Sequence, residues 1–233
     1  MMTKSVVSYL GNKTYPGRTL VLSVSPDAKT ATIVYFIMGR SANSQNRIFV
    51  DDREVVRTQA FDTSEVADPS LIIYPIYRFL GRTHIFTNGD QTETIYQGLA
   101  AGLLPAEALQ ERDCEPDAPN FTPRISLIAQ PEGYSINIIK AAEETGQTSL
   151  HFDFHYPYTP GLGHCIHTYY DDGDPLPSYS GEPVMFSHED NLGRKIWDAI
   201  NPQLKVSLLE ATLDLETSEI INMSLFNKHE VNP

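Results

Sequence analysis

The chain has 233 residues, of which 41% are hydrophobic and 20% charged, and this balance excludes disordered and fibrous classes. No apolar run approaches the roughly 20 residues of a membrane-spanning helix, and the start lacks the apolar region of a signal peptide. A formal net charge of −13 argues against binding to nucleic acid or to an anionic membrane. Two cysteines, Cys114 and Cys165, make no disulfide framework, so we expect a reduced, cytoplasmic setting.

The first part of the chain is dominated by strand patterns. We predict strands at 6–10, 20–25 and 31–38, with a turn through Pro26 and Asp27 between the last two. Residues 39–47 are polar and are expected to form a loop, and further strands are expected at 50–59, 71–80 and 83–86.

The middle of the chain contains helical spacing after a turn at 87–90. A helix is predicted over 91–103, with Asp90 as its N-cap and Glu93 as the capping-box partner, and Pro105 opens a second helix. A proline-rich loop over 114–123 leads to expected strands at 124–129, 134–141, 150–156 and 165–170.

The last part begins with a turn-rich segment over 171–183. The apolar face of Leu192, Ile196, Trp197 and Ile200 predicts a helix over 187–200, followed by strands at 204–215 and 219–225. Strands interrupted by few helices, with no linker or repeat, predict a single layered α+β domain over residues 1–233.

The common chemical motifs are missing: there is no GxGxxG, GxxxxGK, GxSxG or HExxH pattern. His151, Asp153 and His155 would share one strand face, either as a divalent-metal site or as the polar face of an exposed edge. Cys114 beside Glu115 is either a nucleophile or a small buried residue. We expect no metal site.

Arginine is concentrated between Arg40 and Arg124, where eight of the ten arginines lie, and no lysine occurs between Lys29 and Lys140. These arginines either form planar forks for an anionic ligand or pair with acids at the surface. Two loops concentrate polar groups in this region, one over 39–47 and a stiff, proline-rich one over 115–124.

Four motifs in this order and at this spacing resemble the archaeal-type IMP cyclohydrolase family and its bacterial homologues. They are Tyr9-Leu10-Gly11, Gly39-Arg40-Ser41 with Asn46-Arg47, the run over 87–93, and Glu115 with Thr122-Pro123-Arg124-Ile125. The resemblance covers about residues 5–185 and is clearest over 39–125, which leaves 187–233 as a C-terminal extension of the same domain.

The resemblance implies a four-layer α-β-β-α sandwich similar to the Ntn hydrolase fold. It lacks the N-terminal nucleophile, in keeping with the start Met1-Met2-Thr3. It also implies closure of 5-formamidoimidazole-4-carboxamide ribonucleotide (FAICAR) to IMP and water, in purine biosynthesis, without metal, redox group or other cofactor. The alternative is a non-catalytic purine-nucleotide-binding or regulatory protein on the same fold. A homo-oligomer is compatible with both functions.

Site residues follow from the same motif positions. The resemblance makes Glu115 the base or proton shuttle, Tyr74 the donor to the formyl oxygen, and Arg47 the group that orients the carboxamide and stabilises oxyanion charge. Residues expected to bind the base and ribose phosphate are Arg40, Asn46, Asn88, Gly89, Thr122 and Arg124. Without the motifs, the simpler interpretation is a core aromatic at Tyr74, a solvent-facing Glu115 and a surface ion pair at Arg47.

Overall fold

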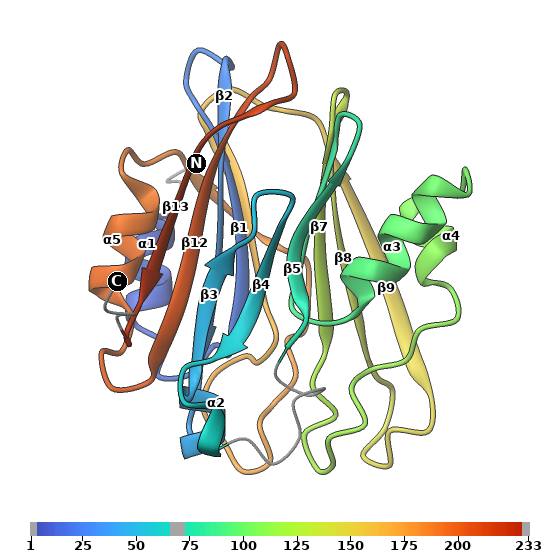
Figure 1. Ribbon diagram of the computed structural model, residues 1–233, viewed down its shortest axis with the longest axis vertical. Helices are drawn as coiled ribbons and strands as arrows, with labels where there is room; N and C mark the ends of the chain where they lie inside the picture. The colour runs from blue at the N-terminus through green and yellow to red at the C-terminus, as the bar shows by residue number, and fades with distance from the viewer. Residues whose placement is uncertain (1–3, 66–72, 230–233) are drawn as a thin grey trace.

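Two antiparallel sheets pack face to face in the computed structural model, which describes residues 4–65 and 73–229 (Figure 1). The first sheet has the order β11-β10-β1-β2-β12-β13. Its strands are β1 (Arg18–Val24), β2 (Thr30–Met38), β10 (Leu162–His167), β11 (Val184–Ser187), β12 (Lys205–Asp214) and β13 (Ile220–Asn227).

The second sheet follows the chain from β3 to β9 without a crossover. Its strands are β3 (Arg47–Asp51), β4 (Val55–Ala60), β5 (Pro75–Leu80), β6 (Thr83–Thr87), β7 (Arg124–Gln130), β8 (Gly133–Ala141) and β9 (Ser149–Tyr156). Each neighbouring pair is antiparallel, and a helical segment lies between β6 and β7.

Apolar side chains fill the space between the sheets because alternate residues of each strand point inward. Tyr35 of the first sheet stacks on Phe49 of the second with ring centroids 5.6 Å apart. Phe86, Leu127 and Ile136 join the same buried cluster.

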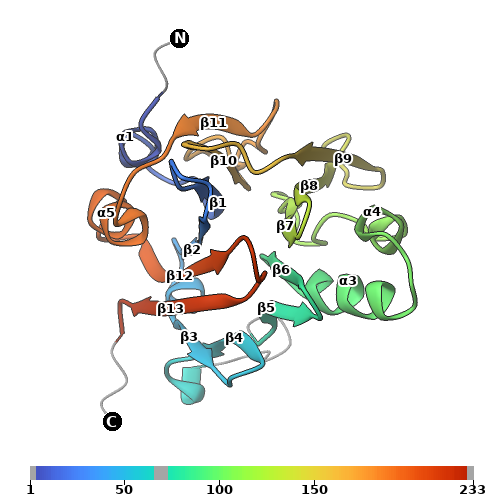
Figure 2. The ribbon, with the colours of Figure 1, turned by 90° about the horizontal axis from the view of Figure 1, so that it is seen from above.

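Helices cover the outer face of each sheet (Figure 2). The helical segments are α1 (Val6–Gly11), α2 (Ala42–Gln45), a 3₁₀ turn (Thr63–Glu65), α3 (Gln91–Ala100), α4 (Pro105–Leu109) and α5 (Leu192–Ala199). Leu10 of α1 and Ile196 of α5 pack on the first sheet, whereas Ile95 of α3 and Leu109 of α4 pack on the second. The predicted α+β class is therefore confirmed, with the layers helix, sheet, sheet, helix.

Several expected elements differ in type or bounds. Residues 6–10 form a helix instead of a strand, because the Ser5 hydroxyl accepts from the Ser8 N–H at 3.1 Å and Val6 and Leu10 share one buried face. The predicted loop over 39–47 contains the short helix α2, capped by Ser41. The single strand expected over 50–59 is split into β3 and β4 by a turn in which the Asp52 N–H donates to the Val55 carbonyl at 3.0 Å.

The capping box expected at Asp90 is wrong. Asp90 makes no side-chain cap bond, because its carboxylate instead accepts from Arg112 and Arg124, each at 2.6 Å. Glu93 pairs with Arg78 of β5. The acidic side chains of this turn therefore connect α3 to neighbouring segments instead of capping the helix.

The C-terminal segment is built into the first sheet. Strand β12 lies between β2 and β13, and α5 covers that sheet's outer face. Two sequence expectations, the start of the strand predicted over 71–80 and the residues Met1-Met2-Thr3, lie wholly or partly outside the described residues. Within the described ranges, no helix is long and apolar enough to cross a membrane.

Candidate active site

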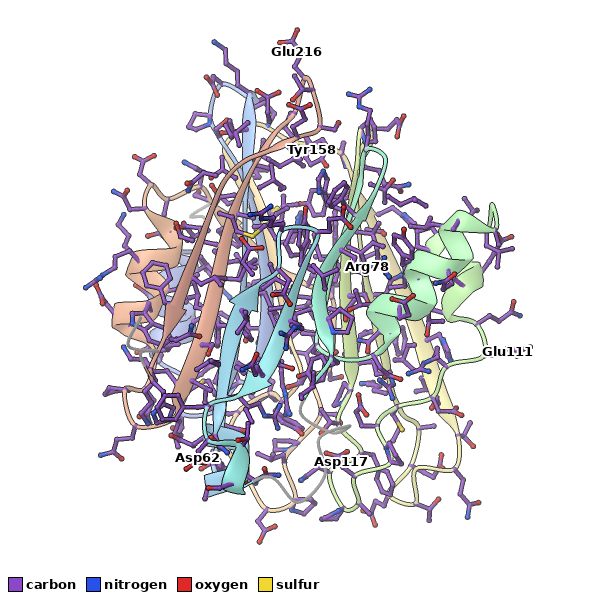
Figure 3. The ribbon with its side chains drawn as sticks, in the orientation of Figure 1. Asp62, Arg78, Glu111, Asp117, Tyr158 and Glu216 are labelled. Carbon is purple, nitrogen blue, oxygen red and sulfur yellow. The ribbon has the colours of Figure 1, made fainter. Side chains whose placement is uncertain are left out.

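A cavity of about 580 Å³ opens at the end of the molecule that carries Asp117, opposite the end marked by Glu216 (Figure 3). Seven of the nine predicted site residues line it: Arg47, Tyr74, Asn88, Gly89, Glu115, Thr122 and Arg124. Its wall also includes Arg18, Asn43, Asp90, Pro116 and Asp117, which the sequence prediction did not include.

Strand ends bring these side chains together. Arg18, Arg47 and Arg124 are the first residues of β1, β3 and β7, and Tyr74 immediately precedes β5. Asn88 and Gly89 follow the last residue of β6. The cavity thus lies where both sheets end, and rigid strands fix the positions of groups that are far apart in the sequence.

Glu115 is a partly buried carboxylate held by one arginine. Its Oε1 lies 2.6 Å from Arg124 Nη1, and its Oε2 accepts from Nη2 at 3.1 Å. Its backbone N–H donates to the Thr122 carbonyl at 3.0 Å, which closes the loop around the site. Burial raises the pKa of the Glu115 carboxyl, an effect that Arg124 opposes and Asp90 reinforces. A carboxyl with a raised pKa exchanges protons closer to neutral pH than a solvated one.

Arg124 is occupied by protein partners on every side. Its Nε donates to the Asp113 carbonyl at 2.7 Å, and its Nη1 contacts Asp90 at 2.6 Å and Gln91 at 3.1 Å as well as Glu115. Although burial works against it, hydrogen bonds and charge from Arg112 and Arg124 lower the pKa of the Asp90 carboxyl. Arg124 is therefore placed to position Glu115.

Gly89 has no side chain, and atoms of Gln91, Glu115 and Arg124 occupy the space where one would lie. A Cβ at Gly89 would lie 2.6 Å from Gln91 Oε1, 3.0 Å from Glu115 Oε1 and 3.1 Å from Arg124 Nη1. Any side chain here would displace the carboxylate or its arginine, so the close approach of the backbone is part of the site.

Tyr74 and Arg47 present polar atoms without a close hydrogen-bond partner. The Tyr74 hydroxyl and the Arg47 Nε are buried without a close hydrogen-bond partner among the described residues, and the Tyr74 hydroxyl lies beside the Tyr35 hydroxyl. Neither Arg18 nor Arg47 forms an ion pair within the described chain, in contrast to Arg40, Arg57, Arg78, Arg112, Arg124 and Arg194. Buried donors of this kind are expensive unless a ligand satisfies them. The cavity is therefore suited to an anionic, oxygen-rich ligand.

Two predicted binding residues are not in the cavity wall. Arg40 donates to Asp172 and to the Gly173 carbonyl, both at 2.8 Å, and lies over the Tyr15 ring. The Asn46 side chain holds the backbone of Asp62, donating to its carbonyl and accepting from its N–H at 2.7 Å. Both side chains are used to fix loops near the site.

Asn88 and Thr122 line the cavity but also carry structural bonds. Asn88 donates to the Pro123 carbonyl at 2.9 Å and accepts from the Ile125 N–H at 2.8 Å. The Thr122 hydroxyl bonds to Asp117 and to Tyr169. These bonds hold the 115–125 segment against β6 and the first sheet.

The residues behind the two alternative chemical interpretations lie outside the cavity wall. His151, Asp153 and His155 lie on the exposed strand β9, and no group of three or more metal-binding side chains occurs in the described residues. Cys114 is buried outside the cavity wall, with its N–H donating to the Ser149 hydroxyl at 3.0 Å.

The missed residues had little local signal. Arg18 lies outside the arginine-rich stretch, and its neighbours form an ordinary strand pattern. The sequence around Asp90 indicates a helix cap, and Asp117 is one acid within a proline-rich loop. Only the meeting of strand ends from the two sheets places these side chains in one wall.

Fold and cavity together define an α+β protein with a cavity lined by arginines and carboxylates. The chain belongs to the family described as IMP cyclohydrolase-like protein, which it matches over residues 15–217. It is 33% identical over 138 residues to a protein of Methanopyrus kandleri named IMP cyclohydrolase, covering 55% of this chain and 65% of that protein. The match thus spans just under two thirds of that relative's length.

Proposed function

We propose that this protein closes the ring of FAICAR to give IMP and water. The observation that carries the proposal is one cavity that holds Glu115, a carboxylate with a raised pKa, together with the buried Tyr74 hydroxyl and with Arg18 and Arg47. Neither arginine forms an ion pair with a described residue. Family membership and the name of the Methanopyrus relative support the same reaction.

Ring closure needs a base that acts on the carboxamide nitrogen and an acid that acts on the formyl oxygen. The carboxamide nitrogen attacks the formyl carbon, and Glu115 accepts the proton that this nitrogen loses. The C=O π bond breaks, and the formyl oxygen takes a proton from Tyr74, with Arg47 stabilising its developing charge. Glu115 returns its proton to the hydroxyl oxygen, the C–O bond breaks and the oxygen leaves as water. The formamido N–H proton passes to the Tyr74 phenolate as the C=N bond forms, so both side chains regain their starting states. The reaction is neither an oxidation nor a reduction, so the proposal assigns it no cofactor.

Arg18 is proposed to bind the substrate phosphate. It lines the cavity and has no carboxylate partner among the described residues, and arginine suits a dianionic group. Arg18→Gln should raise KM for FAICAR by about tenfold or more while kcat changes less, the pattern of lost uniform binding. Arg194→Gln, at an exposed pair on α5, is the control. A large kcat loss at unchanged KM would contradict the assignment.

Arg124 is proposed to position Glu115 and to limit how far burial raises the pKa of the Glu115 carboxyl. Because Arg124 lowers the pKa of Glu115, Arg124→Gln should raise that pKa further. A base works only above its pKa, so the acid limb of kcat/KM should move to higher pH. Arg112→Gln removes a second partner of Asp90 without touching Glu115 and should leave the limb nearly in place. Equal shifts in both variants would argue against this role.

The wider features of the protein follow from the same proposal. We infer that the helix–sheet–sheet–helix layering is the sandwich of the Ntn hydrolase fold, and that residues 1–233 act as one domain, since β12 lies inside the first sheet. Free, buried Cys114 and Cys165 support a reduced, cytoplasmic setting.

Formation of IMP from FAICAR by the purified chain tests the function. Detection of IMP as the product, by chromatography with mass spectrometry, is the expected result. Binding of IMP without its formation from FAICAR would instead identify a purine-nucleotide-binding protein.

A further inference from the structure

The four sheet edges of this fold are not equally protected. At β3 and β13 the edges meet, because the Asn227 side chain accepts from the Phe49 N–H at 2.8 Å and donates to its carbonyl at 3.1 Å. Strand β11 has only four residues and is bridged by Lys4. Strand β9 has eight residues and pairs only with β8 within the described chain, at the end of its sheet (Figure 2).

Strand β9 also lacks several of the features that keep edges from pairing. It contains no proline and no lysine, and its register with β8 runs without a bulge. Leu150 and Phe152 are each 41% exposed on one face, and His151 and Asp153 are exposed on the other. A long edge without a bulge and with exposed apolar side chains is a template for another strand.

We propose that β9 pairs antiparallel with β9 of a second copy, about a twofold axis through Phe152. Strand alternation then sets every opposite pair. Phe152 faces the partner's Phe152, and Leu150 faces the partner's Phe154. On the other face His151 lies opposite the partner's Asp153, and the axis repeats this pair.

Charge selects this register over its neighbour. The run His151-Phe152-Asp153-Phe154-His155 reads the same in both directions, so an axis through Asp153 is also geometrically allowed. That axis places two Asp153 carboxylates opposite one another, and like charges at opposite positions destabilise a strand pair. Moving the axis by one residue exchanges this repulsion for two His–Asp pairs.

One hydrogen bond connects strand β9 to the loop that carries Glu115. Ser149, the first residue of β9, accepts from the N–H of Cys114, which precedes Glu115. Pairing of β9 therefore supports the strand that anchors this loop. The proposal depends on β9 alone and does not require the proposed reaction.

Sedimentation velocity over a wide range of protein concentration tests the proposal. The unmodified chain should form a species of twice its mass. His151→Asp faces the partner's Asp153 twice and should weaken association about tenfold or more. The exchange His151→Asp with Asp153→His restores the His–Asp pairs and should recover the dimer. Ile221→Lys, at a 57% exposed position on β13, is the matched surface control and should leave it intact.

Three results would overturn it. The first is an unmodified chain that stays monomeric at every concentration. The second is an exchange variant that dimerises no better than His151→Asp alone, which would exclude this register. The third is a dimer that only Ile221→Lys dissociates, which would place the interface elsewhere. Circular dichroism of each variant checks that the sheets are retained.

Discussion

Turnover of FAICAR by Glu115→Gln is expected to fall by ~10²-fold or more, the effect of losing a general base. Glutamine keeps the length of the side chain and one carbonyl acceptor for Arg124, which holds the carboxylate at 2.6 Å. It removes the group that takes the carboxamide proton. Steady-state kcat, measured from the absorbance change of ring closure, gives the result.

The same variant should bind IMP with nearly unchanged affinity, because the product has no proton to lose at this step. Glu111→Gln is the control, since this exposed side chain lies at the periphery of the molecule (Figure 3). If Glu115→Gln turns over like the unmodified protein, Glu115 is not the base. If it loses IMP binding altogether, Glu115 is a binding or structural residue.

Tyr74→Phe should separate activity from stability. The ring is 9% exposed and packs in the core between the sheets, whereas its hydroxyl is buried without a close hydrogen-bond partner among the described residues. Phenylalanine has no hydroxyl that is buried without a close hydrogen-bond partner, so the free energy of unfolding should stay level or rise. Turnover should nevertheless fall by ~10²-fold, because the formyl oxygen loses its proton donor.

Tyr134→Phe is the matched comparison because it should behave in the opposite way. The Tyr134 hydroxyl hydrogen-bonds His164 Nδ1 at 2.6 Å, and the residue lies outside the cavity wall. Its removal should lower the free energy of unfolding by about 1 kcal/mol and leave kcat unchanged. Thermal melts and kcat for both variants give the comparison. A Tyr74→Phe protein that is destabilised but fully active would make Tyr74 an ordinary core aromatic.

Much of the cavity was predictable because its groups follow ordered motifs. Arg47, Glu115 and Thr122 belong to loops whose composition is unusual, and Tyr74 belongs to the strand pattern predicted over 71–80. The roles of their neighbours were less predictable, because a motif does not reveal which donors are already occupied. Arg124 illustrates this, since its contacts with Asp90, Gln91 and Glu115 appear only when β6 and β7 lie side by side.

The fold contained two features that local patterns misrepresent. Val6 and Val7 suggest a strand, but the Ser5 cap and the buried pair Val6 and Leu10 favour a helix packed on α5. The strand predicted over 204–215 is confirmed as β12 (Lys205–Asp214), yet no local signal places β12 between β2 and β13. Pairing partners depend on contacts across the whole chain, which propensity does not encode.

Incubation of the purified protein with FAICAR, with IMP formation followed by absorbance, tests the central claim most directly. The account predicts catalytic conversion that Glu115→Gln and Tyr74→Phe each reduce by ~10²-fold, while Tyr134→Phe retains it. Conversion no faster than the uncatalysed reaction, from a folded protein that binds IMP, would contradict it.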